Sequence, residues 1–367
     1  IKVIFNMPLV PSYIKRLANY KPGKPIEEAQ RELGLKNIIK LASNENPLGA
    51  SPKAISAIKD SLKNIHRYPD ASGYQLRSKL AEKFSLNIGN VVIGAGSEGI
   101  MSTIMRTFLL RDDELISAKN SFIGFKVLAN ASGCRAHWVP MKKYCYDLEA
   151  MKEKINDYTK IIYIANPDNP MGTYITKQEF ASFYKHVPER VLIILDEAYF
   201  EFANEIQDYP DSMTYRYDNV ITLRSFSKAY GLGGVRIGYG FAHESLVNNI
   251  LKVKVPFEPS TIAQVAGHAA LDDTKFLLKS ITINNEGKQF LSTELRKLGI
   301  KQVPSATNFI TTLWDSKKHS LDIVDRLLKA GVIVRHLESF GWKNCIRISI
   351  GTKEENSILI QKLNNIL

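Results

Sequence analysis

Short apolar runs typical of buried strands alternate with helical patterns between residues 76 and 255 of this 367-residue chain. The candidate strands are residues 91–95, 114–118, 136–139, 161–165, 191–195, 220–223 and 237–241. Residues 161–164 and 191–195 are continuously apolar, as expected for strands that helices cover on both faces. The helical patterns between strands include residues 75–84, 98–110 and 177–186. This alternation predicts an α/β fold with a mostly parallel seven-stranded sheet between helices.

The pattern changes after Pro256 and Pro259. A helix near residues 261–271 and a long amphipathic helix over 275–298 precede a mixed segment. That segment has predicted strands at 309–313, 332–335 and 345–350, a helix at 321–330 and a closing helix from about residue 353. We therefore expect a large domain over residues 46–255 and a smaller α+β domain over residues 256–367. Residues 1–45 contain four prolines and are predicted to form an N-terminal arm.

The charge and cysteine patterns exclude several classes of partner. The formal net charge is +12, but no run of five or more Lys or Arg occurs, which favours a solvated surface over a nucleic-acid-binding one. No apolar run approaches the roughly 20 residues of a membrane span, so we expect a cytoplasmic protein without membrane contact. The three cysteines have no C-x-x-C spacing, so neither a disulfide framework nor a metal site is expected.

Polar residues follow four of the predicted strands at the point where each strand ends. They are residues 94–99 (Gly-Ala-Gly-Ser-Glu-Gly), 166–170 (Asn-Pro-Asp-Asn-Pro), 196–199 (Asp-Glu-Ala-Tyr) and 225–228 (Ser-Phe-Ser-Lys). Taken singly, such segments are ordinary turns and helix caps. Because ligands of open α/β sheets bind outside the carboxyl ends of the strands, their order along the chain predicts one shared binding crevice.

The residue types in this crevice suit the chemistry of pyridoxal phosphate. The amine of Lys228 can form a Schiff base with the aldehyde and then move a proton. The carboxylate of Asp196 can keep the ring nitrogen protonated, because an opposite charge favours the charged form. The protonated ring then accepts electrons. Tyr199 and Asn169 can hydrogen-bond the ring oxygen O3′.

A phosphate group requires backbone N–H groups at a helix start, hydroxyls and a guanidinium. All three kinds of group occur near the predicted crevice. The expected phosphate-binding residues are Gly96, Ser97, Glu98, Ser225, Ser227 and Arg236.

Three of these segments resemble the signatures of the fold-type I (class I and II) pyridoxal-phosphate aminotransferases. They are residues 166–172 (Asn-Pro-Asp-Asn-Pro-Met-Gly), 196–199 and 225–239. The resemblance implies that Lys228 is the lysine of the internal aldimine and that Asp196 pairs with the pyridine nitrogen. It further implies that Tyr199 binds O3′ and that Arg236 binds the phosphate. We therefore expect Lys228, Asp196 and Tyr199 to be the catalytic residues.

Two positions depart from the family pattern. Met171 stands where the family usually has Thr, and Phe122 stands where a tyrosine often stacks on the cofactor ring. Phe122 keeps the π face needed for stacking and loses only the hydroxyl.

Within this family, four further segments resemble the histidinol-phosphate aminotransferase group. They are residues 20–28 (Tyr-Lys-Pro-Gly-Lys-Pro-Ile-Glu-Glu), 41–49 (Leu-Ala-Ser-Asn-Glu-Asn-Pro-Leu-Gly), 67–70 (Arg-Tyr-Pro-Asp) and 345–352 (Cys-Ile-Arg-Ile-Ser-Ile-Gly-Thr). The resemblance implies transfer of the amino group of histidinol phosphate to 2-oxoglutarate in histidine biosynthesis, through the Lys228 aldimine and a 1,3-proton shift. It also implies a homodimer in which Tyr68 reaches the cofactor phosphate of the neighbouring subunit.

The substrates implied by this resemblance carry anionic groups in two forms, a phosphate and carboxylates. Planar guanidinium groups bind both. We expect Arg347 to bind the α-carboxylate of the acceptor, and Arg335 and Tyr20 to bind the distal anion, with Tyr20 crossing from the partner's arm. Asn44 is a further candidate that faces the substrate.

Other activities on the same fold stay open at this point. Threonine-phosphate decarboxylases and aromatic amino acid aminotransferases resemble this group closely. Decarboxylation differs only in placing the carboxylate, rather than the proton, perpendicular to the ring. A non-catalytic binding or regulatory protein on this fold is an alternative of another class.

Overall fold

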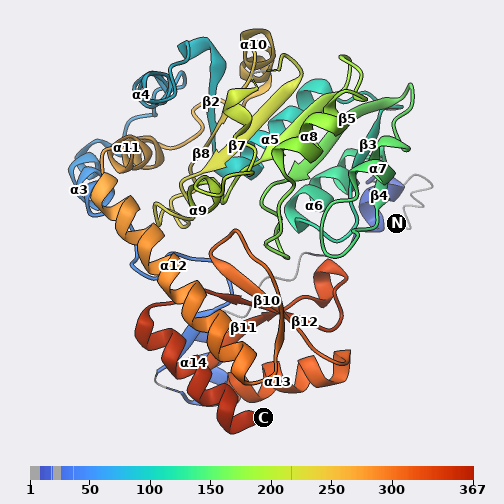
Figure 1. Ribbon diagram of the computed structural model, residues 1–367. Helices are drawn as coiled ribbons and strands as arrows, with labels where there is room; N and C mark the ends of the chain where they lie inside the picture. Colours follow the sequence, from blue (N-terminus) through green and yellow to red (C-terminus); the bar gives the residue numbers. More distant parts are fainter. Residues whose placement is uncertain (1–8, 18, 20–25, 36, 216) are drawn as a thin grey trace, which may run out of the picture.

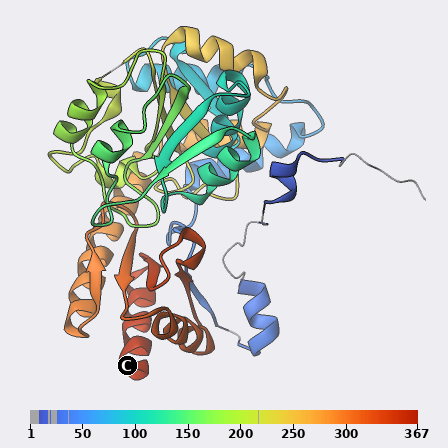
Figure 2. The same cartoon turned by 90° about the vertical axis from the view of Figure 1, so that its right-hand side faces the viewer.

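Two sheets of different size organise the chain, and a long helix runs from one to the other (Figure 1). The computed structural model describes residues 9–17, 19, 26–35, 37–215 and 217–367. The larger sheet has seven strands and the smaller has five. The connecting helix is α12 (Thr274–Lys297). Viewed after a 90° turn, the two sheets still lie one above the other (Figure 2).

The seven-stranded sheet has the order β2-β8-β7-β6-β5-β3-β4. Its strands are β2 (Val91–Gly94), β3 (Glu114–Ala118), β4 (Arg135–Val139), β5 (Thr159–Ala165), β6 (Leu192–Asp196), β7 (Val220–Ser225) and β8 (Gly238–Phe241). Only β8 runs antiparallel to its neighbours; the other pairings are parallel. The predicted mostly parallel sheet is therefore confirmed, and each predicted strand end lies within two residues of the observed one.

Helices cover both faces of this sheet (Figure 1). They are α3 (Pro52–Ser61), α4 (Tyr74–Lys83), α5 (Gly96–Phe108), α6 (Ile123–Ser132), α7 (Leu148–Lys152), α8 (Lys177–Tyr184), α9 (Phe200–Ala203), α10 (Glu244–Val253) and α11 (Thr261–Ala270). Alternate residues of a strand point to opposite faces. Tyr163 of β5 thus packs in one core with Met101 of α5, and Ile162 packs in the opposite core with Phe180 of α8. This double burial explains the continuously apolar runs of the central strands.

The smaller sheet has the order β1-β11-β12-β10-β9. Its strands are β1 (Ile39–Leu41), β9 (Lys301–Val303), β10 (Phe309–Leu313), β11 (Val332–His336) and β12 (Cys345–Ser349). Helices α12, α13 (Lys317–Lys329) and α14 (Lys353–Ile366) pack on it. Helix α13 begins four residues before the predicted start, because the side chain of Ser316 caps its first turn by accepting from the N–H of His319 at 3.1 Å.

Strand β1 and helix α11 each pack with a part of the molecule other than the domain in which the sequence placed them. Strand β1, within the predicted arm, pairs parallel with β11 of the smaller sheet. The other described helices of this region are α1 (Ser12–Lys15) and α2 (Ile26–Leu33), at the side of the molecule (Figure 2). Helix α11 packs on α3 and α4, against the larger sheet. The boundaries 1–45, 46–255 and 256–367 stay predictions, and this packing favours placing the second one after α11.

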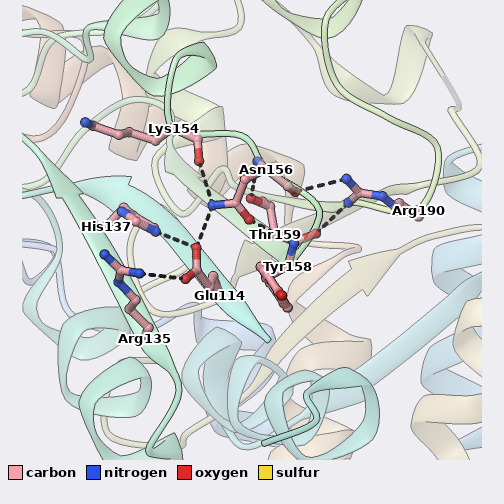
Figure 3. A network of polar contacts seen from close by, with 8 residues as sticks. All are labelled: Glu114, Arg135, His137, Lys154, Asn156, Tyr158, Thr159 and Arg190. Carbon is pink, nitrogen blue, oxygen red and sulfur yellow. Dashed lines mark hydrogen bonds and ion pairs between the residues drawn. The ribbon is translucent and has the colours of Figure 1, made fainter. Parts of the chain in front are cut away.

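A buried carboxylate joins the amino-terminal ends of three strands (Figure 3). Glu114, the first residue of β3, accepts hydrogen bonds from His137 Nε2 at 2.6 Å and Asn156 Nδ2 at 2.7 Å. Arg135 of β4 adds an ion pair at 3.2 Å. Arg190 donates to the carbonyl oxygen of Asn156 at 2.9 Å and so extends the network to the segment before β6. Hydrogen bonds, chiefly the one from Asn156, lower the pKa of the Glu114 carboxyl below its usual value.

We expect Glu114→Gln to lower the free energy of unfolding by about 2 kcal/mol at pH 7, because a charge-assisted network loses its anion. The pKa of Glu114 is lower in the folded state, so its contribution is complete above the unfolded value of about 4.3 and is lost as pH falls through the folded value. Urea unfolding at pH 7 and pH 3 measures both effects. Glu149→Gln removes an exposed carboxylate paired with Lys152 and should change little. A deficit for Glu114→Gln that is equal at both pH values would contradict this explanation.

Candidate active site

A cavity of about 740 Å³ lies outside the carboxyl ends of β5, β6 and β7, between the two sheets. Of the sixteen residues predicted to form the site, fourteen line it. They are Asn44, Gly96, Ser97, Glu98, Phe122, Asn169, Asp196, Tyr199, Ser225, Ser227, Lys228, Arg236, Arg335 and Arg347. The strand order of the larger sheet thus brings together segments that are far apart in the chain.

The amine of Lys228 enters this cavity just after β7. Its Nζ lies 3.5 Å from the carbonyl oxygen of Ser43 and 5.8 Å from the ring centroid of Tyr199. Burial, followed by the nearby positive charge of Arg347, lowers the pKa of Lys228 to about 8. A substantial part of the amine is therefore neutral near physiological pH, which is the form that attacks a carbonyl group.

The carboxylate of Asp196 ends β6, and its two oxygens differ in their surroundings. Oδ2 accepts a hydrogen bond from the hydroxyl of Tyr163 at 2.8 Å, whereas Oδ1 is buried and has no hydrogen-bond partner among the described residues. Burial raises the pKa of Asp196 to about 6, and the Tyr163 hydroxyl opposes that shift. A buried carboxylate oxygen without a donor is unfavourable, so this oxygen suits a ligand that brings an N–H group.

Polar groups from segments next to both sheets also line the cavity. The hydroxyl of Tyr199 accepts a hydrogen bond from Asn44 Nδ2 at 2.9 Å. Burial raises the pKa of Tyr199 to about 12, so the hydroxyl keeps its proton and can still donate it. Arg347 of β12 donates to Asn169 Oδ1 and, at 2.8 Å, to the carbonyl oxygen of Ala42. Arg335 of β11 also lines the cavity. Two guanidinium groups therefore face the space next to Lys228.

The start of α5 brings backbone N–H groups and a guanidinium close together. Gly96 has a positive φ of 74°, and a Cβ there would lie 2.6 Å from Arg236 Nη2. A Cβ at Gly238 would lie 2.5 Å from the backbone nitrogen of Ser97. Only glycine at these two positions leaves the first N–H groups of a 13-residue helix close to a guanidinium. The hydroxyl groups of Ser225 and Ser227 line the same cavity, so the arrangement fits a phosphate.

Two predicted site residues are not among the cavity-lining residues. Tyr68 is 81% exposed and stacks on Phe257 with ring centroids 4.5 Å apart. Tyr20 lies outside the described residues. Met171, which replaces the usual Thr, is fully buried, and its N–H donates to Asp168 Oδ2 at 3.0 Å.

Several residues behind the cavity were missed by sequence reasoning. Tyr163 holds Asp196, yet it stands in an apolar strand run and gives no sign of a polar role. The buried Asp168 accepts from Ser121, whose hydroxyl is also 2.7 Å from that of Tyr146. These contacts join the segment that carries Phe122 to the turn that carries Asn169. Asp168 stands in the segment 166–170, which sequence reasoning had singled out. Its contact with Ser121 could not be predicted without knowing which segments lie next to it in the fold.

A fully buried ion pair lies directly next to the site residues in the chain. Arg224 precedes Ser225, and Glu197 follows Asp196. Arg224 Nε and Nη2 lie 2.9 and 2.8 Å from Glu197 Oε2, and Nη2 lies 2.9 Å from Asp211 Oδ1. The guanidinium carbon lies 3.3 Å from the ring centroid of Phe200. This pair ties β6 to β7 where both strands reach the cavity.

The described part of the chain offers neither a metal site nor a membrane span. No group of three or more His, Cys, Asp or Glu residues there could hold a metal ion. None of its helices has the length and apolar character required to cross a membrane.

The comparisons with known proteins agree with this fold. The family model for aminotransferase class I and II matches residues 36–363. "Histidinol-phosphate aminotransferase 2" of Carboxydothermus hydrogenoformans is 40% identical over 361 residues, which is 98% of this chain and 99% of the relative. The histidinol-phosphate aminotransferase of an Anaeromyxobacter species is 40% identical over 98% of this chain and all of the relative. The chain therefore belongs to the class I and II aminotransferases, and within them to the histidinol-phosphate aminotransferase group.

A solved structure shows the same architecture. The histidinol-phosphate aminotransferase of Sinorhizobium meliloti, solved in complex with pyridoxal-5'-phosphate, superimposes with a TM-score of 0.90. It is 28% identical, and the match covers 98% of each chain. The predicted fold-type I architecture is thus confirmed.

Proposed function

We propose that this protein is a pyridoxal-phosphate-dependent aminotransferase that converts histidinol phosphate and 2-oxoglutarate to imidazole acetol phosphate and glutamate, a step of histidine biosynthesis. The observation that carries the proposal is the cavity in which the Lys228 amine, the free oxygen of Asp196 and the anion-binding start of α5 occur together. Support also comes from two relatives, each 40% identical over nearly the whole chain, that carry the name of this activity.

The residues of the cavity fit pyridoxal phosphate. Lys228 would hold it covalently, Asp196 would bind its ring nitrogen, and Tyr199 and Asn169 would bind its ring oxygen, with Phe122 against the ring. Its phosphate would lie at Gly96, Ser97, Glu98, Ser225, Ser227 and Arg236. When bound, the cofactor supplies an electron sink for the negative charge that remains after a proton leaves the substrate carbon.

The chain's own groups control the position of the protons. Asp196 stabilises a protonated ring nitrogen, because its carboxylate is an opposite charge in a buried place. The neutral amine of Lys228 can accept the proton from the substrate Cα and, as an ammonium, return one. Tyr199 keeps its hydroxyl proton and would donate it to the ring oxygen. Burial of these groups excludes water and strengthens each contact.

The two guanidinium groups explain how one cavity accepts both substrates. Arg347 binds the α-carboxylate of 2-oxoglutarate, because its planar fork matches a carboxylate. Arg335 binds the distal anion, which is a carboxylate in one substrate and a phosphate in the other. Asn44 and Tyr20 complete the substrate side in this proposal, Tyr20 from the N-terminal arm.

We further propose a homodimer of two-fold symmetry in the cytoplasm. The support is a group of large apolar side chains exposed near residue 68. Tyr68 is 81% exposed, and Ile65 and Tyr74 are more than 60% exposed. A second copy would cover these side chains and would receive Tyr68 at its cofactor phosphate. Sedimentation equilibrium of the purified protein measures this directly.

A steady-state panel tests the proposed reaction. Histidinol phosphate, phenylalanine, tyrosine and threonine phosphate are each assayed with 2-oxoglutarate, and glutamate and CO₂ are measured. We expect kcat/KM for histidinol phosphate to exceed the values for phenylalanine and tyrosine by on the order of 100-fold, since these two substrates lack a phosphate and leave the groups that bind it unpaired. Release of CO₂ from threonine phosphate without formation of glutamate would instead identify a decarboxylase. A preference for tyrosine or phenylalanine would identify an aromatic amino acid aminotransferase.

A further inference from the structure

Tyr163 and Asp196 lie on neighbouring parallel strands and point to the same face of the larger sheet. Tyr163 of β5 is in register with Ile194 of β6, and Ala165 is in register with Asp196. Because alternate residues of a strand share a face, the side chains of Tyr163 and Asp196 meet on one side. The Tyr163 hydroxyl donates to Asp196 Oδ2 at 2.8 Å, and both residues are buried.

This hydrogen bond makes the two carboxylate oxygens of Asp196 inequivalent. Oδ2 is occupied by Tyr163, while Oδ1 has no partner among the described residues and belongs to a residue that lines the cavity. A carboxylate free to rotate about its Cβ–Cγ bond could present either oxygen. The hydroxyl of Tyr163 fixes that rotation.

The ring of Tyr163 is itself held by packing. It stacks on Phe125 with ring centroids 4.0 Å apart and an angle of 7° between the planes. Phe125 lies in α6, three residues after Phe122, whose side chain lines the cavity. Phe122 is the N-cap residue of α6 and packs against the same core cluster as Phe125 and Tyr163. Tyr163 therefore contacts both the acidic group that lines the cavity and the helix that follows Phe122.

The hydroxyl of Tyr163 acts as a hydrogen-bond donor. Burial and the adjacent charge of Asp196 raise the pKa of Tyr163 well above its ordinary value. The hydroxyl therefore keeps its proton near neutral pH and can donate it to Asp196 Oδ2.

From this geometry we infer that Tyr163 is a positioning residue that orients Asp196 so that Oδ1 meets the ring nitrogen of the cofactor. This inference rests on the proposed function, because the ring nitrogen belongs to pyridoxal phosphate. Tyr163 touches neither substrate nor cofactor in this role; it acts through Asp196.

The test is a thermodynamic cycle with one change on each side of Asp196. One change removes the hydroxyl of Tyr163, and the other removes the ring nitrogen of the cofactor. Apoprotein with Tyr163 or with Tyr163→Phe is titrated with pyridoxal phosphate and with its 1-deaza analogue, in which carbon replaces the ring nitrogen. Equilibrium dialysis gives the four Kd values. We expect Tyr163→Phe to raise the Kd of pyridoxal phosphate about tenfold, which corresponds to one hydrogen bond to a charged group. The Kd of the deaza analogue should change less than about twofold, since it makes no bond with Asp196.

The controls separate a positioning role from a structural one. Tyr239→Phe removes the hydroxyl of another buried tyrosine of the same sheet and should leave both Kd values unchanged. Phe125→Leu loosens the ring of Tyr163 and should weaken pyridoxal phosphate more than the analogue. Equal losses for both ligands, or no loss for either, would overturn the inference while the proposed function stands. A wild-type apoprotein that binds neither ligand would overturn both.

Discussion

Lys228→Ala is expected to reduce kcat for histidinol phosphate by at least about 10⁴-fold, because one change removes both the group that holds the cofactor and the base that moves the proton. Among the described residues that line the cavity, Lys228 is the one lysine, so no second amine can replace it. Its lowered pKa of about 8 comes mainly from burial. The variant should therefore fold normally and should also lose cofactor on dialysis, since only non-covalent contacts remain.

Three measurements check this expectation. Turnover is followed as glutamate formation, retention of cofactor as absorbance after borohydride reduction and denaturation, and folding as thermal unfolding of the apoprotein. Lys288→Ala is the matched control, because the pKa of Lys288 is also lowered by burial but its side chain lies in α12 and outside the cavity. It should alter kcat less than about twofold. A covalent adduct that survives in Lys228→Ala would contradict the assignment of this lysine.

Arg224→Leu is expected to have the largest effect on stability, a loss of about 3–5 kcal/mol in the free energy of unfolding at pH 7. The guanidinium is fully buried and lies against the carboxylates of Glu197 and Asp211. Without it, Glu197 remains a buried anion that has lost its cation. Burial raises the pKa of Glu197, so the carboxyl of the variant must take up a proton to stay inside.

A double-mutant cycle measures the interaction between Arg224 and Glu197 separately from their other contacts. Arg224→Leu combined with Glu197→Gln should be more stable than Arg224→Leu alone, because the second change removes the unpaired charge. The deficit of the single variant should also shrink as pH falls, when Glu197 becomes protonated. Arg135→Leu, which removes a mostly exposed guanidinium, serves as the control and should cost less than about 1 kcal/mol. Strict additivity in urea unfolding would show that the two side chains act independently.

The larger sheet could be predicted from the sequence because each of its central strands is recognisable from its own residues. A strand covered on both faces must be apolar at consecutive positions, and residues 161–164 and 191–195 show this directly. Strand β1 could not be predicted in the same way. Its three residues, Ile39–Leu41, become a strand only by pairing with residues 332–334, almost 300 positions later in the chain.

The residues of the cavity also differ in whether the local sequence or a distant partner determines their place. Lys228 and Asp196 follow strands and stand in recognisable motifs, so their approach to one another could be predicted from the order of the segments. Tyr163 could not, because its role depends on which strand lies beside β6 and on their register. The exposed Tyr68 shows a further limit. Within one chain it stacks on Phe257 outside the cavity, and its proposed role requires a second copy.

The pairing of β1 with β11 means that the lower half of the molecule is assembled from both ends of the polypeptide. A fragment that contained only residues after α11 would leave β11 with an open backbone edge, and unpaired strand edges invite association with other chains. Exchange of this half between related enzymes would therefore have to carry residues 39–41 together with the C-terminal portion. During synthesis, residues 39–41 leave the ribosome long before residues 332–334 with which they pair. The smaller sheet can therefore form completely only after nearly all of these 367 residues have emerged.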